Sequence, residues 1–373
     1  EAAADVQLRR LGLKYRVSTP LWNRARTGPE ADAEADGIVR VFEPAVPPSL
    51  FEGLTRAFSD SAFWDGHGYP TDCFFSYNVP LDTAGSGLIY QTINTIRPAL
   101  EKATGSRFVA AEWWAHRRSV GADGGHQLHF DLDERARDQD QSIKHPAYSS
   151  VLYLETGAGC APTVVTDYCI DQPDGKAEEA QCWRCHPAPN RLLVFKGSAL
   201  HGVVPVIADQ TGGLPKRRVT LMIGWWAEQP SISPVPLLEE TTLVGLGPNM
   251  PLPQMPKKKK KAAMPWQALL IGPSNEVTVN KPEDGMSPNR SALESCGKLW
   301  QVVSPQNRRR GEKPRRLAPG ADAMFTGHYF VQDPHDIYLS SMPSQSTRVG
   351  ETVDGCIEIE EMSLEDLKRL RGE

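Results

Sequence analysis

The sequence predicts a mainly β protein with flanking helices (α+β), built around a double-stranded β-helix, or jelly roll. Between about residues 41 and 228, short apolar or alternating runs are separated by Gly, Pro and Asp, which is typical of strands joined by turns. Segments with helical spacing precede most of these runs, and we expect them to buttress a sheet. The composition changes beyond residue 228, so the β domain is predicted to end there.

The predicted helices come first in the chain. Apolar residues recur at helical spacing in residues 49–58, and a second helix fits residues 88–104, ending before Gly105, a residue type that often follows a helix. Strand-sized runs then follow at residues 108–118, 127–132, 149–155, 163–168, 192–195, 202–207 and 217–227. Such a series of short strands suits a jelly roll of the cupin-like kind.

Composition divides the chain into four parts. Residues 1–40 form an N-terminal arm, and residues 41–228 hold the β domain with its helical preface. Residues 229–261 are rich in proline and end in adjacent lysines that repel one another, so they are predicted to be an exposed linker. Residues 262–373 form a C-terminal extension with enough apolar residues to dock on the core. Within the extension we expect a strand at 328–332 and a helix opened by Ser363.

The overall composition argues against two classes of partner. The chain of 373 residues has a formal net charge of -5, which predicts neither a nucleic-acid-binding protein nor one held at a membrane surface. No apolar run approaches the roughly 18 residues of a spanning helix, so we expect a soluble protein with no membrane partner. Its location stays unknown, with an intracellular one favoured.

The residues that carry chemistry are His129, Asp131 and His201. His129 and Asp131 are two positions apart at the end of an alternating run, so they are expected to share one face of a strand and hold one metal ion. His201 lies where an apolar strand turns at Gly197 and a second strand begins. Two imidazoles and one carboxylate form a facial triad, which is typical of non-haem Fe(II) oxygenases. We predict these three residues as metal ligands and as the catalytic centre.

An anion is expected close to the metal. The apolar strand from residue 217 opens with Arg217 and Arg218, and a buried strand has no reason to begin with guanidinium groups unless an anion pairs with them. Alternation places Arg218 and Thr220 on one face, whereas Arg217 shares its face with the packing residues. We therefore predict that Arg218, assisted by Thr220, binds a carboxylate.

This combination of His-x-Asp, distal His and Arg-x-Thr resembles the Fe(II)/2-oxoglutarate-dependent dioxygenase superfamily, over about residues 108–228. The run Val151-Leu152-Tyr153-Leu154-Glu155 and the turn from Gly157 to Thr163 are similar to the prolyl-hydroxylase branch. The resemblance implies Fe(II) as the metal, 2-oxoglutarate as co-substrate, O2 as oxidant, and succinate and CO2 as products, and it leaves ascorbate open as a further cofactor. It also implies that Tyr153 contacts the 2-oxoglutarate carboxylate and that Asp131 favours hydroxylation.

Three functions stay open at this point. The first is an oxygenase that hydroxylates a protein side chain or a small metabolite, and the second is a non-catalytic cupin-like metal-binding or sensing module. The third is a nucleic-acid oxidative demethylase that uses the basic clusters at residues 257–261 and 308–316, since such clusters attract phosphates. Nucleic acid is not favoured, because no stacking platform is evident between the clusters. The primary substrate is unknown.

Several histidines and aromatic residues have competing interpretations. His126 lies three positions before His129, and this odd offset predicts that it points to the opposite face of the strand. Asp133 shares the face of Asp131 but lies farther from His129. The group His116, Trp113 and Trp114 either lines the cavity or packs in the core.

The cysteines also leave alternatives open. The segment 182–186, Cys-Trp-Arg-Cys-His, matches the covalent haem attachment motif. A disulfide, a zinc site completed by Cys160 or Cys169, or free surface thiols on a loop fit the same residues. The seven cysteines are too thinly spread for a disulfide scaffold.

Overall fold

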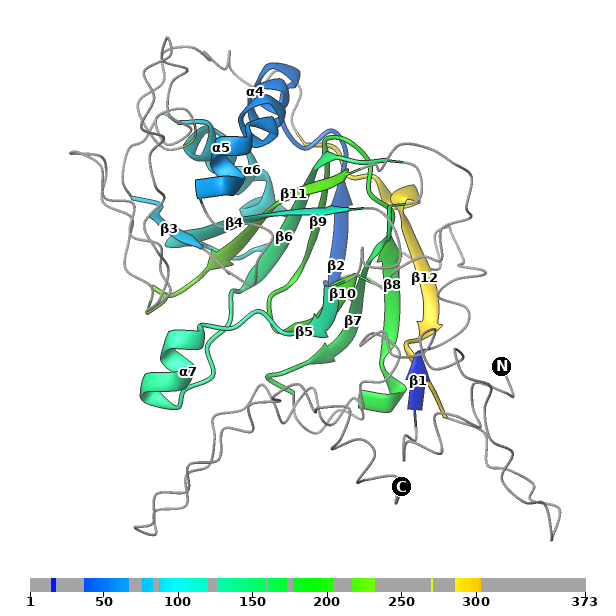
Figure 1. The fold of residues 1–373 in the computed structure, drawn as a ribbon. Helices are drawn as coiled ribbons and strands as arrows, with labels where there is room; N and C mark the ends of the chain where they lie inside the picture. The colour runs from blue at the N-terminus through cyan, green and yellow to red at the C-terminus, as the bar shows by residue number, and fades with distance from the viewer. Residues whose placement is uncertain are drawn as a thin grey trace, which may run out of the picture. The chain divides into compact units, whose positions relative to one another are not determined.

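A computed structural model of the chain describes residues 15–17, 37–66, 76–82, 87–119, 126–157, 160–172, 177–203, 217–231, 270 and 286–302. Most strands of this part belong to two antiparallel sheets (Figure 1). The first sheet has six strands in the order β2 (Val39–Phe42), β9 (Arg191–Lys196), β6 (Tyr148–Glu155), β11 (Arg217–Trp226), β4 (Ala110–Ser119) and β3 (Tyr77–Pro80). The second has five in the order β12 (Leu293–Lys298), β8 (Gln181–Cys185), β7 (Thr163–Cys169), β10 (Ala199–Val203) and β5 (His126–His129).

The chain passes repeatedly between the two sheets. Strands β4, β6, β9 and β11 belong to the first sheet, while β5, β7, β8 and β10, which connect them, belong to the second. This alternation is that of a double-stranded β-helix, so the predicted fold class is confirmed. Strand β11 is central to the first sheet, because it pairs with β4 along its whole length and with β6 on its other side.

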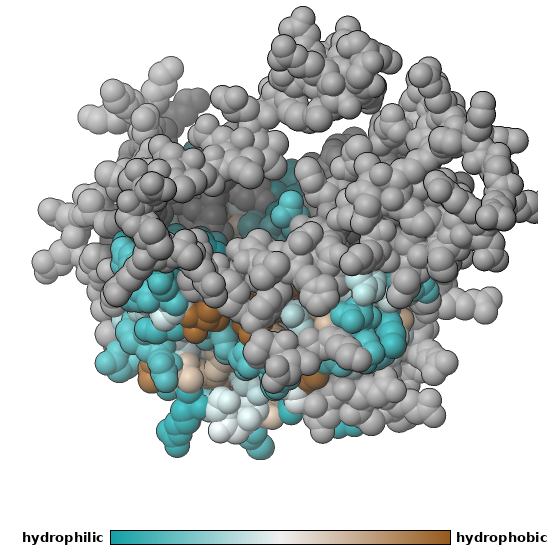
Figure 2. All heavy atoms as spheres, turned by 90° about the horizontal axis from the view of Figure 1, so that it is seen from below, coloured by the Kyte–Doolittle hydropathy of each residue, from teal (hydrophilic) through white to brown (hydrophobic). Residues whose placement is uncertain are grey.

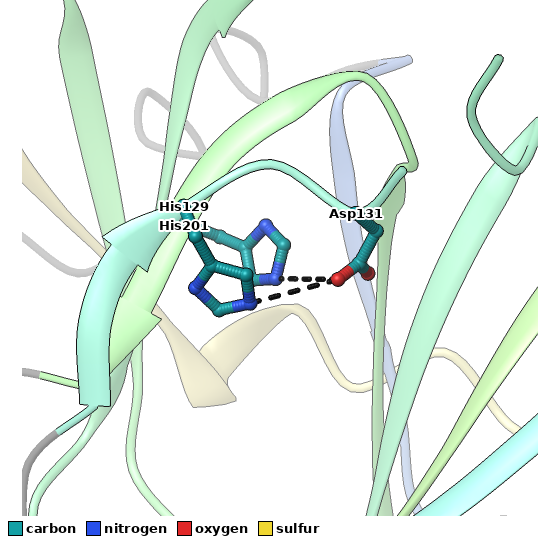
Figure 3. A group of neighbouring side chains, drawn as sticks. All are labelled: His129, Asp131 and His201. Carbon is teal, nitrogen blue, oxygen red and sulfur yellow. Dashed lines mark ion pairs between the residues drawn. The ribbon is translucent and has the colours of Figure 1, made fainter. Parts of the chain in front are cut away.

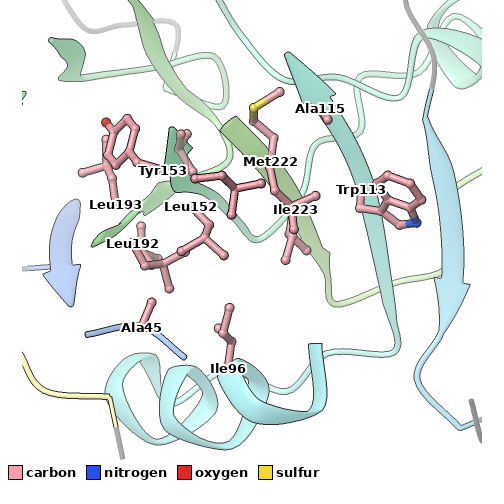
Figure 4. Close-up of a cluster of buried hydrophobic side chains, with 14 of the residues drawn as sticks. Ala45, Ile96, Trp113, Ala115, Leu152, Tyr153, Leu192, Leu193, Met222 and Ile223 are labelled. Carbon is pink, nitrogen blue, oxygen red and sulfur yellow. The ribbon is translucent and has the colours of Figure 1, made fainter. Parts of the chain in front are cut away.

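The helices α4 (Pro48–Ser59), α5 (Ser61–Gly66) and α6 (Leu88–Thr104) cover one face of the six-stranded sheet (Figure 1). Their apolar residues belong to the same buried cluster as those of the sheet. Ile96 of α6 points toward Leu192 and Ile223, while Met222 lies on the other side of the sheet (Figure 4). The predicted helix at 88–104 is confirmed together with its end, where Gly105 adopts the left-handed conformation with a φ of 72°.

A fourth helix, α7 (Glu134–Asp140), follows the metal-binding motif and was not predicted. Asp133 caps it by accepting a hydrogen bond from the backbone N–H of Ala136 at 2.9 Å. The predicted strand 127–132 is therefore wrong at its end: β5 stops at His129, and residues 130–133 lead into α7. The strand predicted from residue 202 begins earlier, at Ala199, and residues 204–207 lie outside the described part.

The described part of the C-terminal extension contributes one strand to the five-stranded sheet and one to a separate two-stranded sheet. Strand β12 pairs with β8, and β13 (Trp300–Val302) pairs with β1 (Tyr15–Val17). Leu299 and Trp300 join a second buried cluster, together with residues of β7 and β8. The domain boundaries stay a prediction. The lysines of the linker, the basic cluster at 308–316, the strand at 328–332, the helix after Ser363 and most of the N-terminal arm lie outside the described residues.

The surface of the described part shows no extended apolar area on the face seen from below. Hydrophilic residues predominate there, and the apolar ones form small separate spots (Figure 2). Val109, with 45% of its surface exposed, is the large apolar side chain that protrudes among the described residues. None of the described helices is both long enough and apolar enough to cross a bilayer.

We predict that Gly197→Ala destabilises the fold. Gly197 lies in the turn between β9 and β10, and a Cβ atom there would stand 2.0 Å from the carbonyl oxygen of Pro146. Because backbone must move, we expect a loss of about 1–3 kcal/mol in the free energy of unfolding, measured by urea titration. Gly224→Ala is the matched control, since its Cβ would meet the Pro146 ring at 3.2 Å. An equal loss in both variants would contradict the backbone contact as the cause.

Candidate metal centre

Three side chains converge on one point between the two sheets (Figure 3). His129 is the last residue of β5, Asp131 follows in the segment before α7, and His201 lies in β10. The Nε2 atoms of His201 and His129 lie 3.5 and 3.6 Å from Oδ1 of Asp131. Ligand atoms of the three residues all lie within 4.8 Å of one another. A single ion with bonds of about 2.0–2.2 Å fits this spacing.

Backbone hydrogen bonds determine which nitrogen each histidine offers. Nδ1 of His129 lies 2.8 Å from the carbonyl oxygen of Gln127, and Nδ1 of His201 lies 2.9 Å from that of Ala199. A carbonyl oxygen accepts but cannot donate, so each Nδ1 carries the hydrogen and each Nε2 keeps its lone pair for a metal.

The carboxylate is oriented in the same way. Ser149 donates a hydrogen bond to Oδ2 of Asp131 at 2.6 Å, so Oδ1 is the oxygen that faces the two imidazoles. The side chain of Asp131 is 11% exposed and that of His201 is 8% exposed, whereas His129 is 35% exposed. The centre is thus open to ligands mainly on the side of His129.

Charge coupling sets the protonation of these ligands. Burial alone would raise the pKa of Asp131, yet the charge and the hydrogen bonds of His201 and His129 hold it well below its usual range. Burial alone would lower the pKa of His201, but the adjacent Asp131 carboxylate raises it above its ordinary value. A proton and a metal ion therefore compete for Nε2 of His201.

The triad lies in the wall of a cavity of about 60 Å³. One water molecule requires about 10–15 Å³, so the cavity has room for several waters or for part of a small organic ligand. Its lining combines apolar residues, namely Trp114, Val151, Phe195, Val203 and Met222, with polar ones, namely His116, Arg118, His126, Ser149, Ser150, Thr163, Arg218 and Thr220.

Arg218 is buried in this cavity, as the alternation predicts, and Thr220 lines it on the same face. Nη2 of Arg218 donates to Oγ1 of Thr163 at 2.7 Å, and its guanidinium carbon lies 5.4 Å from the centre of the Tyr153 ring. Nε of Arg218 is buried without a hydrogen-bond partner. Such a donor is unfavourable until a ligand satisfies it. Arg217, the neighbour in sequence, is exposed.

Tyr153 packs against the guanidinium group of Arg218 and also contacts Thr163. It is fully buried and is not among the residues that line the cavity, and its hydroxyl donates to Oγ1 of Thr163 at 2.8 Å. Because Thr163 accepts from both Tyr153 and Arg218, its own hydroxyl hydrogen is available to a ligand. Sequence reasoning did not assign a role to Thr163, although it ends the turn on which the family resemblance partly rested.

His126 lines the cavity, so its predicted orientation away from His129 is wrong. The pairing of β5 with β10 contains an irregularity: His129 faces His201, but His126 faces Val203, so three steps along β5 match two along β10. This bulge changes the alternation and turns His126 toward its neighbour. The two imidazole rings lie 4.6 Å apart.

The remaining candidate residues lie either in the cavity wall or in the protein interior. His116 and Trp114 line the cavity, whereas Trp113 stacks on Tyr77 in the core with ring centres 4.8 Å apart. Burial, together with the charge of Arg118, lowers the pKa of His116 to about 3, so this imidazole is neutral. Asp133 is fully buried and accepts from the N–H of Ser231 as well as capping α7, so it is not a metal ligand.

Cys182 and Cys185 are buried free thiols on β8, so the expectation of surface thiols on a loop is wrong. They lie in different buried clusters, because a three-residue offset along a strand places them on opposite faces. They cannot attach one haem or share one zinc ion. Among the described residues, the group that can hold a metal is the triad of His129, Asp131 and His201.

No protein-family model matches the sequence, and no curated protein matches it either. Solved structures with a similar fold include a prolyl-4-hydroxylase from Pseudomonas putida, with 16% identity over 55% of this chain and 98% of that chain at a TM-score of 0.32. Another is EctD from S. alaskensis with 2-oxoglutarate and 5-hydroxyectoine, with 13% identity over 62% and 93% at 0.37. A third is an oxidoreductase of the 2OG-Fe(II) oxygenase family from Burkholderia pseudomallei, with 16% identity over 55% and 94% at 0.29.

The first of these structures is named a hydroxylase and the third an oxygenase of the 2OG-Fe(II) family, which is the class that the sequence pattern resembles. At such low identity and TM-scores, the likeness gives no argument about what this chain does. The function has to be argued from the residues of the site.

We predict that metal affinity falls as the pH decreases through the raised pKa of His201. Asp131 raises this pKa above the ordinary histidine value of about 6.5, so protonation of Nε2 begins to displace the metal above that pH. Titration with Co(II) at several pH values measures the effect. In the metal-free protein, Asp131→Asn should lower the pKa of His201 followed by NMR. An unchanged pKa in that variant would contradict the coupling.

Proposed function

We propose that this protein is an Fe(II)- and 2-oxoglutarate-dependent oxygenase that hydroxylates a protein side chain or a small metabolite, with formation of succinate and CO2. The observation that carries the proposal is the presence, in one cavity, of a His/Asp/His ligand set and a buried arginine whose Nε has no partner. The first fits a metal, and the second fits an anion bound beside it.

The donor set suits Fe(II). His129 and His201 would hold the ion through neutral imidazole nitrogens and Asp131 through a carboxylate oxygen, a donor set that suits an Fe(II) ion that also binds a co-substrate and O2. When bound, the iron supplies the activation of O2 that is coupled to decarboxylation of 2-oxoglutarate. The chain's own contribution is to fix the ligands: the carbonyls of Gln127 and Ala199 orient the histidines, and Ser149 orients Asp131.

Arg218 is the proposed partner of the distal carboxylate of 2-oxoglutarate. Nε and an Nη of a guanidinium form a planar fork that matches a carboxylate, and here Nε is already in place and unsatisfied. Thr163 and Thr220 line the cavity with Arg218 and offer hydroxyl groups to the same anion. Tyr153, which the family resemblance suggested as a direct contact, would act through Thr163, to which it donates.

The arginine also favours an enzyme over a metal-binding module without turnover. Binding of a metal by three protein ligands requires no buried guanidinium, and burying an unpaired charge is unfavourable. A site that holds both a metal and an organic anion accounts for it. The nucleic-acid hypothesis depends on basic segments that lie outside the described residues.

We predict that the protein forms succinate from 2-oxoglutarate, slowly even without its primary substrate, and that Asp131→Ala abolishes this reaction. The protein is loaded anaerobically with Fe(II) and 2-oxoglutarate, the visible charge-transfer band is recorded, and succinate is measured after admission of O2. The exposed residue Asp138 in α7 provides the control Asp138→Ala, which should behave as wild type. Iron binding without succinate formation in the wild type would indicate the metal-binding module instead.

We further predict that Arg218→Gln weakens 2-oxoglutarate binding, while Arg217→Gln changes it less than about twofold. Removal of a buried charge-assisted pair typically loses about 2–5 kcal/mol, which corresponds to at least about 30-fold in affinity. Anaerobic titration of the band with 2-oxoglutarate measures the loss, and Fe(II) binding in both variants should be unchanged. A larger effect of Arg217→Gln would mean that the exposed arginine binds the co-substrate.

A further inference from the structure

A second arginine, Arg118, lines the cavity from the strand next to that of Arg218. Arg118 in β4 and Arg218 in β11 are Cα partners in adjacent antiparallel strands, and both line the cavity. Burial lowers the pKa of Arg218, and the charge of Arg118 lowers it further, so the two groups interact. Like charges at directly opposed positions of a sheet are destabilising. Their presence here concentrates positive charge at one wall of the cavity.

The two guanidinium groups turn toward different strands. Arg218 donates to Thr163 in β7 and lies over Tyr153 in β6. Nη2 of Arg118 lies 2.7 Å from Nδ1 of His126 in β5. In the second sheet, β10 with His201 runs between β7 and β5. The arginines therefore do not form a single fork but mark two positions in the cavity, and that of Arg118 lies beside His126, which packs against His129.

The contact with His126 orients Arg118 without neutralising it. A guanidinium N–H donates and cannot accept, so Nδ1 of His126 accepts and this imidazole is neutral, with its hydrogen on Nε2. His126 in turn packs against the ring of His129, 4.6 Å away. A charged, oriented guanidinium is thus anchored beside the metal ligands.

We propose that Arg118, held by His126, binds an oxyanion of the primary substrate, a carboxylate or a phosphate, and so selects an acidic substrate. The inference rests on the proposed function, because Arg218 is assigned there to 2-oxoglutarate. Trp114 and His116 lie on the same face of β4 as Arg118, and both line the cavity. They provide an aromatic surface for the part of the substrate that follows its acidic group.

The test uses the full chain, loaded anaerobically with Fe(II) and saturating 2-oxoglutarate, so that the co-substrate occupies Arg218. Acetate and inorganic phosphate are the probes and acetamide is the neutral control, all at constant ionic strength. The midpoint of thermal unfolding and the visible band are followed. We expect saturable binding of at least one anion and none of acetamide.

The variants separate the two arginines. Arg118→Gln should weaken anion binding at least about 10-fold, and Arg118→Lys, which keeps the charge but loses the fork, should fall between it and the wild type. Arg117→Gln is the control, because Arg117 lies over the ring of Trp64, 5.0 Å from its centre, and is not among the residues that line the cavity. It should bind the anions as the wild type does. Arg118→Lys also keeps the test valid if Arg118→Gln does not fold.

Failure of the proposed function would be visible first, as the lack of a charge-transfer band in the wild type. With the band present, the role of Arg118 is overturned by any of three results. Neither anion binds the loaded wild type, acetamide binds as well as acetate, or the Arg118 variants lose 2-oxoglutarate as strongly as Arg218→Gln does. The preference between acetate and phosphate tells whether the substrate carries a carboxylate or a phosphate.

Discussion

At Gly202, strand β10 passes so close to β5 that a Cβ atom would lie 2.9 Å from the carbonyl oxygen of His126 and 3.0 Å from that of Gln127. A larger residue there would push the two strands apart. This close approach makes His129 and His201 cross-strand partners, with ring centres 4.3 Å apart. The bulge in β5 lies at the same contact and turns His126 into the cavity. The ligand pair and its histidine neighbour therefore depend on one glycine.

Strand β11 connects the cavity to the hydrophobic core, because one of its faces packs in the core and the other lines the cavity. Leu221 and Ile223 belong to the main hydrophobic cluster, which also includes residues of the covering helices. The residues that alternate with them along the strand, namely Arg218, Thr220 and Met222, line the cavity. The burial of one face thus fixes the register of the other, since a slip by one residue would exchange them. Apolar packing in this way stabilises a charged group in a desolvated position.

The sequence predicted those features that depend on strict alternation or on local motifs. Arg218 and Thr220 could be placed on one face because β11 pairs with β4 without a break in register, and the helix at residues 88–104 could be bounded by Gly105. His126 was misplaced because a bulge leaves no mark in the pattern of apolar residues. Thr163 was overlooked because its importance arises from two partners, Tyr153 and Arg218, that meet it only in the folded chain.

The motif at Cys182 and Cys185 was also misinterpreted, because its structure depends on strand pairing that the local sequence does not reveal. The spacing of Cys182 and Cys185 suggested haem or zinc, but the pairing of β8 with β7 and β12 makes the segment a strand and places the thiols on opposite faces. Its partner β12 lies more than a hundred residues farther along the chain, so no local sequence pattern predicts this pairing. Pairing with distant strands therefore determines the structure of this segment, and the structure differs from the one that the motif predicts.

That pairing also changes how the C-terminal extension relates to the site. All the proposed ligands of metal and co-substrate precede residue 228, yet β12 covers the edge of β8, and Arg184 pairs there with Glu294. Strand β8 in turn pairs with β7, which carries Thr163. An uncovered edge would leave β8 with unpaired backbone groups. Strand β12, within the described residues 286–302, therefore provides none of the proposed ligands, but it stabilises, through β8, the strand that presents Thr163 to Arg218.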